Sequence, residues 1–285
     1  MTRYALDPSM PVLLRPDGDV QIGWDPRRAL LVRPPDGVTP TALTGLLRGM
    51  HAGITPDDLR AAAAEAGLRD AAALDDLLAA LVDAGVVTVA RTVSRSHRTR
   101  TASIRIHGRG PLSDLLSSGL RCSGARVFQS RLSHAEVTPD STDLVVLSDY
   151  LVTEPRVVQQ LHAVAMPHLP VHIRDGAGMI GPLVIPGRTS CLGCADLHRS
   201  DRDSAWPAVA AQLRGTVGCA DRATLLATAA LALDQVDRVI RAVRESGDAR
   251  RPAGPPPTLD TTIEFDVRRH SIVARRWSRH PHCSC

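Results

Sequence analysis

Residues 185–194 read Ile-Pro-Gly-Arg-Thr-Ser-Cys-Leu-Gly-Cys, and residues 282–285 read His-Cys-Ser-Cys. Cys191 and Cys194 form a C-x₂-C pair, and Cys283 and Cys285 supply a second close pair far along the chain. Four thiolates that leave no open coordination position are typical of a structural zinc site rather than a catalytic one. A disulfide or a redox pair is the alternative for the same cysteines. We therefore expect a structural zinc knuckle that ties the C-terminal segment to the middle of the chain.

The composition is that of a soluble globular protein with room for two domains, at 285 residues, 44% hydrophobic and 22% charged. The sequence has no long apolar run and no signal-like N-terminus, so we expect a cytoplasmic protein without a membrane span. Every permanent cation is an arginine, because the sequence contains no lysine. That excludes Schiff-base chemistry and the lysine that commonly binds a triphosphate. Aromatic residues make up only 2%, which disfavours a stacking platform for single-stranded nucleic acid.

The N-terminal third predicts short strands followed by three helices and a closing strand. Apolar runs separated by turn formers give strands within residues 11–33. Thr39-Pro40 and Thr55-Pro56 each pair a capping residue with a proline at the first helical position. A third helix is expected at 71–84, and a strand at 86–89. This order predicts a winged-helix-like α+β domain over residues 1–90, joined to the rest by an arginine-rich linker at 91–102.

The C-terminal part predicts strands that alternate with helices, which is typical of a doubly wound parallel sheet. The strand at 103–107 leads into Gly108-Arg109-Gly110, which stands where a G-x-G-x-x-G nucleotide turn would, with Ser113 at the third glycine position. The acidic residue that would hold a ribose at the end of the second strand is missing. We expect an α/β domain over 103–285 that includes a long helix at 222–245.

The segment 143–150, DLVVLSDY, and the segment 169–194, LPVHIRDGAGMIGPLVIPGRTSCLGC, resemble the ThiF/MoeB family of E1-like adenylyltransferases. With the N-terminal domain, the chain is similar to the E1-like partner proteins of azoline-forming cyclodehydratases. The segments 186–207 and 280–285 carry this likeness best. The N-terminal domain resembles the PqqD-like leader-peptide recognition elements, which bind a peptide by strand addition at a sheet edge. A docking or dimerisation domain, or a DNA-binding winged helix, is the alternative, although Asp75, Asp76 and Asp83 on its third helix would repel phosphates.

The resemblance assigns some site residues and leaves others missing. It implies that Asp149 is the Mg²⁺-associated aspartate of a nucleotide site, and that Gly108 and Gly110 form its phosphate turn. The family's Asn/Arg segment is not evident, and its lysine cannot exist here. Since phosphoryl chemistry needs cations on the developing charge, we expect ATP/Mg²⁺ chemistry to be lost and the nucleotide site to be degenerate. In this group a separate YcaO-type domain handles ATP, so such a partner would act in trans.

Two further features remain open between chemistry and structure. Cys219 precedes the long helix and is, by the resemblance, a candidate acyl or persulfide carrier; a small packed residue at a helix start is the alternative. Charged residues crowd the stretch after the cysteine turn, either as a catalytic group or as a salt-bridged surface. They are Asp196, His198, Arg199, Asp201, Arg202 and Asp203. E1-like relatives dimerise through the sheet and long helix, which implies a homodimer.

Together these observations predict a leader-peptide-binding, catalytically degenerate E1-like scaffold that supports a YcaO-type cyclodehydratase in ribosomal peptide modification. No autonomous enzymatic activity is expected. The first alternative is an active ATP-dependent adenylyltransferase or sulfur-transfer enzyme that uses Asp149 and Cys219. The second is a regulatory dimer that binds nucleic acid through its arginines. ATP consumption separates the first alternative from the scaffold, and salt-dependent duplex binding separates the second.

Overall fold

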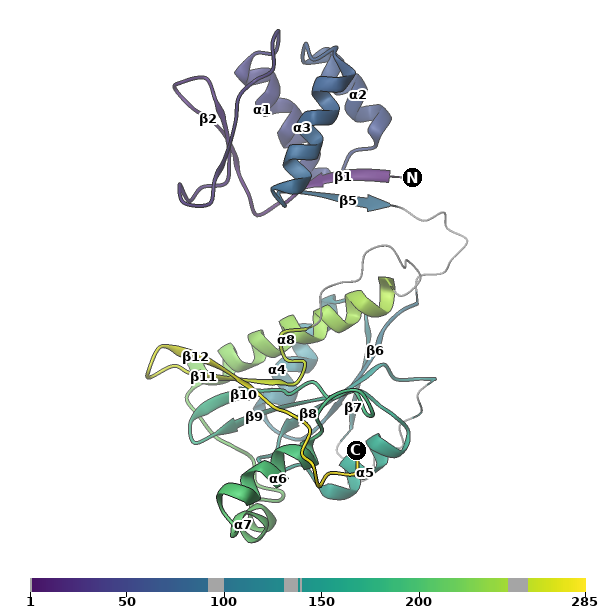
Figure 1. The fold of residues 1–285 in the computed structure, drawn as a ribbon, viewed down its shortest axis with the longest axis vertical. Helices are drawn as coiled ribbons and strands as arrows, with labels where there is room; N and C mark the ends of the chain where they lie inside the picture. The colour runs from purple at the N-terminus through teal and green to yellow at the C-terminus, as the bar shows by residue number, and fades with distance from the viewer. Residues whose placement is uncertain (1, 92–99, 131–137, 139, 246–255) are drawn as a thin grey trace. The chain divides into compact units, whose positions relative to one another are not determined.

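The computed structural model describes residues 2–91, 100–130, 138, 140–245 and 256–285. The chain divides into two compact units, Met1–Arg98 (unit 1) and Thr99–Cys285 (unit 2), each with its own hydrophobic core (Figure 1). Most of the expected linker lies outside the described residues. No described helix combines the length and apolar character that a membrane crossing requires.

Unit 1 contains two small sheets and three helices. A two-stranded antiparallel sheet pairs β1 (Thr2–Leu6) with β5 (Val87–Arg91), and a three-stranded sheet has the order β2-β3-β4. The latter strands are β2 (Val12–Leu14), β3 (Val20–Ile22) and β4 (Leu30–Val32), and the helices are α1 (Pro40–Gly49), α2 (Pro56–Glu65) and α3 (Ala71–Asp83), with a short 3₁₀ turn at Met50–Ala52. The expected strands and helices form, but β1 was not anticipated from the sequence.

The helices of unit 1 begin where the sequence predicts. The Thr39 hydroxyl accepts from the Ala42 amide at 3.1 Å, and the Thr55 hydroxyl accepts from the Asp58 amide at 3.2 Å. Each threonine thereby satisfies an amide that the helix itself leaves without a partner. Leu43, Leu47 and Leu59 are at most 1% exposed and form part of the core of this unit.

Unit 2 is built on a seven-stranded sheet of order β12-β11-β10-β9-β8-β6-β7. Strands β6 to β9 are mutually parallel, and β10 to β12 continue the sheet antiparallel. The strands are β6 (Ser103–His107), β7 (Arg126–Ser130), β8 (Leu144–Asp149), β9 (His168–Arg174), β10 (Ala177–Ile180), β11 (Thr261–Asp266) and β12 (Ser271–Arg276). The helices are α4 (Pro111–Gly119), α5 (Pro155–Ala163), α6 (Leu192–Arg202), α7 (Trp206–Gln212) and α8 (Arg222–Glu245), with a 3₁₀ turn at Leu120–Cys122.

Helices cover both faces of this sheet. Alternate residues of a strand point to opposite faces, so a single strand packs against helices on both sides. On β8, Leu144 and Val146 belong to the core that includes α4 and α8, whereas Val145 and Leu147 pack with Val157 of α5 and its neighbours. Figure 1 shows α8 running along the sheet beside α4. The α/β class and the doubly wound arrangement predicted from the sequence therefore match the structure.

The order in which successive strands are placed in the sheet changes direction at β6. From β6 it passes through α4 to β7 on one side, and β8 then pairs with β6 on the other side. In open α/β sheets, ligands bind outside the carboxyl ends of the strands at such a switch point. Gly108 follows the end of β6 and Asp149 ends β8, so the structure brings both to this place.

Candidate functional site

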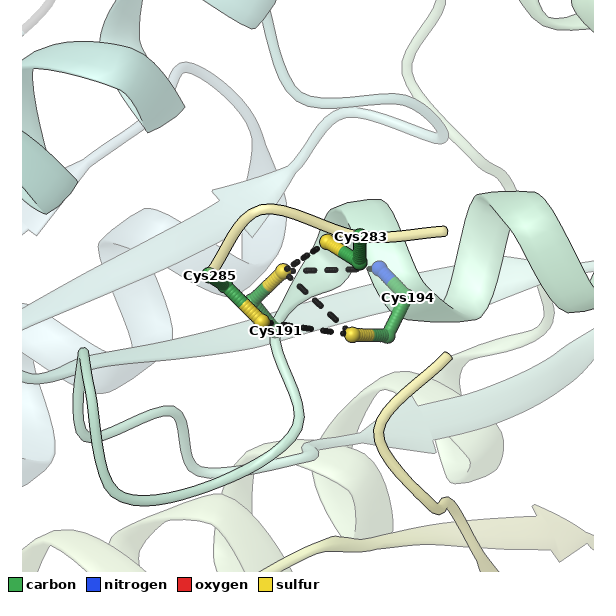
Figure 2. Close-up of side chains that lie close together, drawn as sticks. All are labelled: Cys191, Cys194, Cys283 and Cys285. Atoms are coloured by element: carbon green, nitrogen blue, oxygen red, sulfur yellow. Dashed lines mark hydrogen bonds between the residues drawn. The ribbon is translucent and has the colours of Figure 1, made fainter. Parts of the chain in front are cut away.

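The four cysteines named from the sequence come together in unit 2 (Figure 2). The Sγ atom of Cys191 lies 3.8 Å from that of Cys194 and 3.5 Å from that of Cys283. The Sγ atoms of Cys194 and Cys285 are 3.4 Å apart. Cys191 and Cys194 belong to the start of α6, and the other two come from the C-terminal segment.

The donor set fits a zinc ion. A tetrahedral site with Zn–S bonds of about 2.3 Å places its sulfurs about 3.8 Å apart, close to the three separations observed. All four thiols are free of disulfides. Burial raises the pKa of the Cys191 thiol. At Cys194 burial also acts to raise the pKa, but hydrogen bonds from the His280 and Cys191 backbone outweigh it and lower the pKa to about 7.

The turn that presents Cys191 and Cys194 is anchored by polar contacts on both sides. The Asp260 carboxylate accepts from the Ser190 amide at 2.6 Å and from its hydroxyl at 2.9 Å. The Thr189 hydroxyl accepts from the Ile185 amide at 2.9 Å. Cys191 itself caps α6, since its Sγ accepts from the Cys194 amide at 3.4 Å. These hydrogen bonds hold the turn at residues 186–191 without a contribution from a metal ion.

The segment that carries Cys283 and Cys285 is also held to α6 by histidines. His280 Nε2 lies 2.8 Å from an Asp201 carboxylate oxygen, and His198 Nε2 lies 3.1 Å from the Ser278 carbonyl oxygen. His198, Asp201 and His280 offer ligand atoms within 4.8 Å of one another. The Nδ1 atom of His280 accepts from the His282 amide at 3.1 Å, so the N–H at Nε2 donates to the Asp201 carboxylate. These residues act here as a second attachment of the C-terminal segment.

At the switch point, the Asp149 carboxylate binds the start of α4. It accepts from the Leu112 amide at 2.9 Å and from the Ser113 amide at 3.1 Å, and the Ser113 hydroxyl donates to it as well. Asp149 is 1% exposed and has a left-handed backbone, with φ of 73°. Ser148 Oγ lies 2.8 Å from Ser113 Oγ and extends this buried network. Ser113, the residue that replaces the third glycine, is therefore a partner of Asp149.

The two glycines of this turn are required by close approach. A Cβ atom on Gly110 would lie 2.6 Å from an Asp149 carboxylate oxygen, and one on Gly108 would lie 2.3 Å from the Ser148 carbonyl oxygen. Both distances are shorter than Cβ atoms show in proteins, so a side chain at either position would force its neighbour to shift. In this structure the two glycines let the turn lie close to β8 and to the Asp149 side chain. A bound phosphate would need the same close approach of the backbone.

Cys219 lies in the loop between α7 and α8 and is exposed. This loop runs beside the end of β8: the Gly218 amide donates to the Asp149 carbonyl at 3.2 Å, and the Leu151 amide donates to the Thr216 carbonyl at 2.9 Å. The start of α8 is capped by Asp221, whose carboxylate accepts from the Thr224 amide at 2.7 Å. The structure therefore brings the Cys219 loop next to the switch point, while a different residue caps the helix.

Solved structures share this fold. The chain is similar to the heterocyclase TruD, with a TM-score of 0.67 and 16% identity over 100% of this chain and 42% of that chain. It is similar to a heterocyclase in complex with substrate and cofactor, with a TM-score of 0.69 and 15% identity over 100% of this chain and 39% of that one. It is also similar to E. coli MccB bound to ATP, with a TM-score of 0.61 and 13% identity over 100% of this chain and 99% of that chain.

These likenesses concern the fold, which is mixed α/β with one large sheet. No protein-family model and no curated protein matches the sequence. The chain spans about two fifths of the length of the heterocyclases and nearly the whole length of MccB. The α/β fold that the E1-like resemblance implied is therefore shared with enzymes titled as a heterocyclase and as a microcin C7 biosynthetic enzyme.

Proposed function

We propose that this chain is a peptide-binding, catalytically degenerate E1-like scaffold for the modification of ribosomally made peptides. Unit 1 would hold the peptide's leader, a structural Zn²⁺ would hold the C-terminal segment, and a YcaO-type partner would supply the ATP chemistry. One observation supports the loss of ATP chemistry: the Asp149 carboxylate accepts hydrogen bonds from the amides of Leu112 and Ser113.

Those amides are the ones that a nucleotide phosphate would use. The N-terminus of a helix that follows a glycine turn is an anion site, and here an internal anion already has two of its amides and a hydroxyl. A phosphate would have to displace a carboxylate that is 1% exposed. Its own charge would add to that of Asp149, and no lysine exists to offset them. This supports a site that no longer turns over ATP.

The three-stranded sheet of unit 1 supports the peptide-recognition role. Among the described residues, β4 has a strand neighbour only on its β3 side, whereas the carbonyl of Val12 on β2 accepts from Arg48. Leu31 on β4 is 52% exposed, and Trp24 in the turn before it is 81% exposed. A free edge beside exposed apolar side chains is the surface that strand addition uses. We accordingly assign residues 1–90 to a PqqD-like recognition domain, 91–102 to a linker and 103–285 to the E1-like domain.

The comparisons support a peptide ligand. One MccB structure was solved in complex with N-formylated MccA, and one heterocyclase structure in complex with substrate and cofactor. This chain spans 42% of the length of TruD.

We also propose a homodimer. Helix α8 buries Ala229, Ala232 and Val236 against the sheet, but Leu226 on the same helix is 49% exposed. Ile272, on the edge strand β12, is 62% exposed. Sedimentation equilibrium should give twice the chain mass at micromolar concentration, and a monomer at all concentrations would contradict this part of the proposal.

The second candidate is an active adenylyltransferase or sulfur-transfer enzyme. The observation in its favour is that Asp149 and the backbone of the Cys219 loop meet at the switch point. In that case Asp149 would turn from the α4 amides to Mg²⁺, and Cys219 would carry the product. A structure of MccB, which shares this fold, was solved with ATP, and this supports the second candidate.

Calorimetric titration with ATP·Mg²⁺, together with a pyrophosphate-release assay, separates the two candidates. For the scaffold we expect no heat of binding up to millimolar nucleotide and no pyrophosphate. Binding at micromolar nucleotide, abolished in Asp149→Gly, would contradict the scaffold. Glycine is the suitable replacement because it tolerates the left-handed backbone of Asp149.

Peptide recognition is tested with a displayed library of random twelve-residue peptides selected on the full chain. The selected peptides should bind Leu31→Asn about tenfold more weakly than the unaltered chain, since the substitution removes an apolar side chain beside the β4 edge. Phe128→Asn is the matched control, because Phe128 is similarly exposed but lies on β7 of unit 2. Equal affinities for both variants would remove unit 1 as the peptide site.

A further inference from the structure

A large pocket lies in unit 2, bordered by the ends of β9 and β12, by α6 and α7, and by the loop after β8. Its volume is about 1220 Å³, above the range of roughly 300–1,000 Å³ typical of small-molecule sites. Six arginines and three aspartates line it. The arginines are Arg174, Arg199, Arg202, Arg214, Arg275 and Arg276.

Three of these arginines form ion pairs within the fold, with two carboxylates between them. Arg174 and Arg275 both reach the Glu264 carboxylate, at 3.0 Å and 3.4 Å. Arg199 pairs with Asp196 at 2.8 Å. Arg202, Arg214 and Arg276 have no carboxylate within ion-pair distance among the described residues; they are exposed at the end of α6, after α7 and at the end of β12. The pocket therefore presents an excess of positive charge from three different elements.

One wall of the pocket is fixed by stacking. The Arg199 guanidinium carbon lies 5.1 Å from the ring centre of Trp206 and 5.3 Å from that of Trp277. Trp206 Nε1 donates to the Asp196 carboxylate at 3.1 Å, which in turn holds Arg199. Two of the three tryptophans of the chain are thus committed to one pocket. A wall held in place before binding loses little entropy when a ligand arrives.

The pKa of His172, which lies on β9 and lines the pocket, reflects the same positive charge. Burial first, and then the charges of Arg174 and Arg199, lower this pKa to about 4. With the His172 imidazole neutral, the arginines supply the positive charge of this part of the pocket. Concave sites lined by one sign of charge concentrate ligands of the opposite sign.

We propose that this pocket binds an acidic peptide segment, whose carboxylates pair with Arg202, Arg214 and Arg276. Its size suits several residues of an extended chain rather than a single small anion. Leucines and valines also line the pocket, among them Leu151, Val158 and Val209, and would pack against the apolar side chains of such a segment. Asp175 and Asp203 line it too, where they can accept hydrogen bonds from the peptide's amides.

The test is fluorescence anisotropy with a labelled twelve-residue peptide of alternating glutamate and leucine, on the full-length zinc-loaded protein. We expect micromolar binding that weakens at least about tenfold in Arg214→Gln/Arg276→Gln, since two charge-assisted contacts are lost. The matched control is Arg222→Gln/Arg241→Gln on α8, with the same change in net charge and no residue in the pocket. The peptide with glutamine in place of glutamate should bind no variant.

Equal weakening in both double variants would reduce the effect to general charge attraction and overturn the proposal. Equal binding of the glutamine peptide would do the same. Tighter binding of a labelled oligo-dT, weakened by the pocket substitutions, would assign the pocket to nucleic acid instead. Zinc content and melting temperature of each variant show that it is folded, and Arg202→Gln alone gives an independent reading. The outcome does not depend on unit 1, so Leu31→Asn should leave this binding unchanged.

Discussion

The cysteine centre and the switch-point turn are both polar sites of unit 2, but they differ in what completes them. The cysteine centre brings four sulfurs together, a donor set that fits a metal ion. The switch-point turn directs amides at an anion position and satisfies them with its own aspartate. In our proposal the first site depends on a ligand from solution, whereas the second is complete without one. That difference would teach that a motif can persist in sequence after a side chain of the protein has taken the place of its ligand.

The largest effect should follow from disabling the cysteine centre. Cys194→Ser removes one of four ligands, so we expect zinc content to fall from about one per chain towards zero and unit 2 to lose about 4 kcal/mol, or roughly 8–16 °C in melting temperature. Metal analysis and calorimetry measure both. Cys122→Ser, at an exposed cysteine outside the centre, should leave them unchanged. Full stability without zinc would show that the centre, like the turn, is complete on its own.

Acid should weaken unit 2 through a histidine near the cysteine turn. Burial lowers the pKa of His168 to about 4, while its Nδ1 lies 3.0 Å from the Met166 carbonyl oxygen. The unfolded chain takes up a proton near the ordinary pKa of 6.5 and the folded one only near 4, so stability is complete above 6.5 and is lost as pH falls to 4, by about 3 kcal/mol.

Urea unfolding of the zinc-free protein at a series of pH values isolates this effect from metal loss. His168→Asn keeps a donor for the Met166 carbonyl and cannot titrate, so its stability should change less over the same window. An identical pH dependence in the variant would exclude His168 as the cause.

Removing the Asp149 carboxylate should convert the switch-point turn into a site that needs a ligand from solution, as we propose for the cysteine centre. Asp149→Gly leaves the amides of Leu112 and Ser113 and a hydroxyl without their acceptor, at a cost of about 2 kcal/mol. It also frees the anion position, so inorganic pyrophosphate should bind at millimolar concentration and restore part of the stability. Thermal shift with and without pyrophosphate measures this. A variant that pyrophosphate does not stabilise would contradict the view that Asp149 occupies an anion site.

The smallest effects should come from the glycines of the two sites. Gly110→Ala introduces a Cβ atom 2.6 Å from the Asp149 carboxylate and should cost about 1–2 kcal/mol. Gly193→Ala, between the paired cysteines, introduces one 3.4 Å from the Cys191 sulfur, an ordinary contact within a helix. It should change stability by less than about 0.5 kcal/mol. Equal costs would show that the turn is not packed as closely as described.

The parts of the fold that local patterns determine were predictable. Helix α8 begins and ends at the expected residues, and the cysteines meet as their spacing implies. Strand β1 was missed because its pairing with β5 joins opposite ends of unit 1, which no local pattern reveals. The hydrogen bonds from α4 to Asp149 could not be predicted, because they depend on the left-handed backbone of Asp149 itself and on the Ser113 hydroxyl. The arginine-rich pocket draws on separate segments between residues 151 and 278, so only its stretch 196–203 was visible as a crowd of charges.

The placement of the three tryptophans gives each unit an optical reporter of its own. Trp24, largely exposed in unit 1, should emit at long wavelength and be accessible to a collisional quencher such as acrylamide. Trp206 and Trp277, partly buried and stacked on Arg199 in unit 2, should emit at shorter wavelength and be shielded. Peptide capture at the sheet edge and occupation of the pocket would therefore change different bands of one emission spectrum, without any added dye.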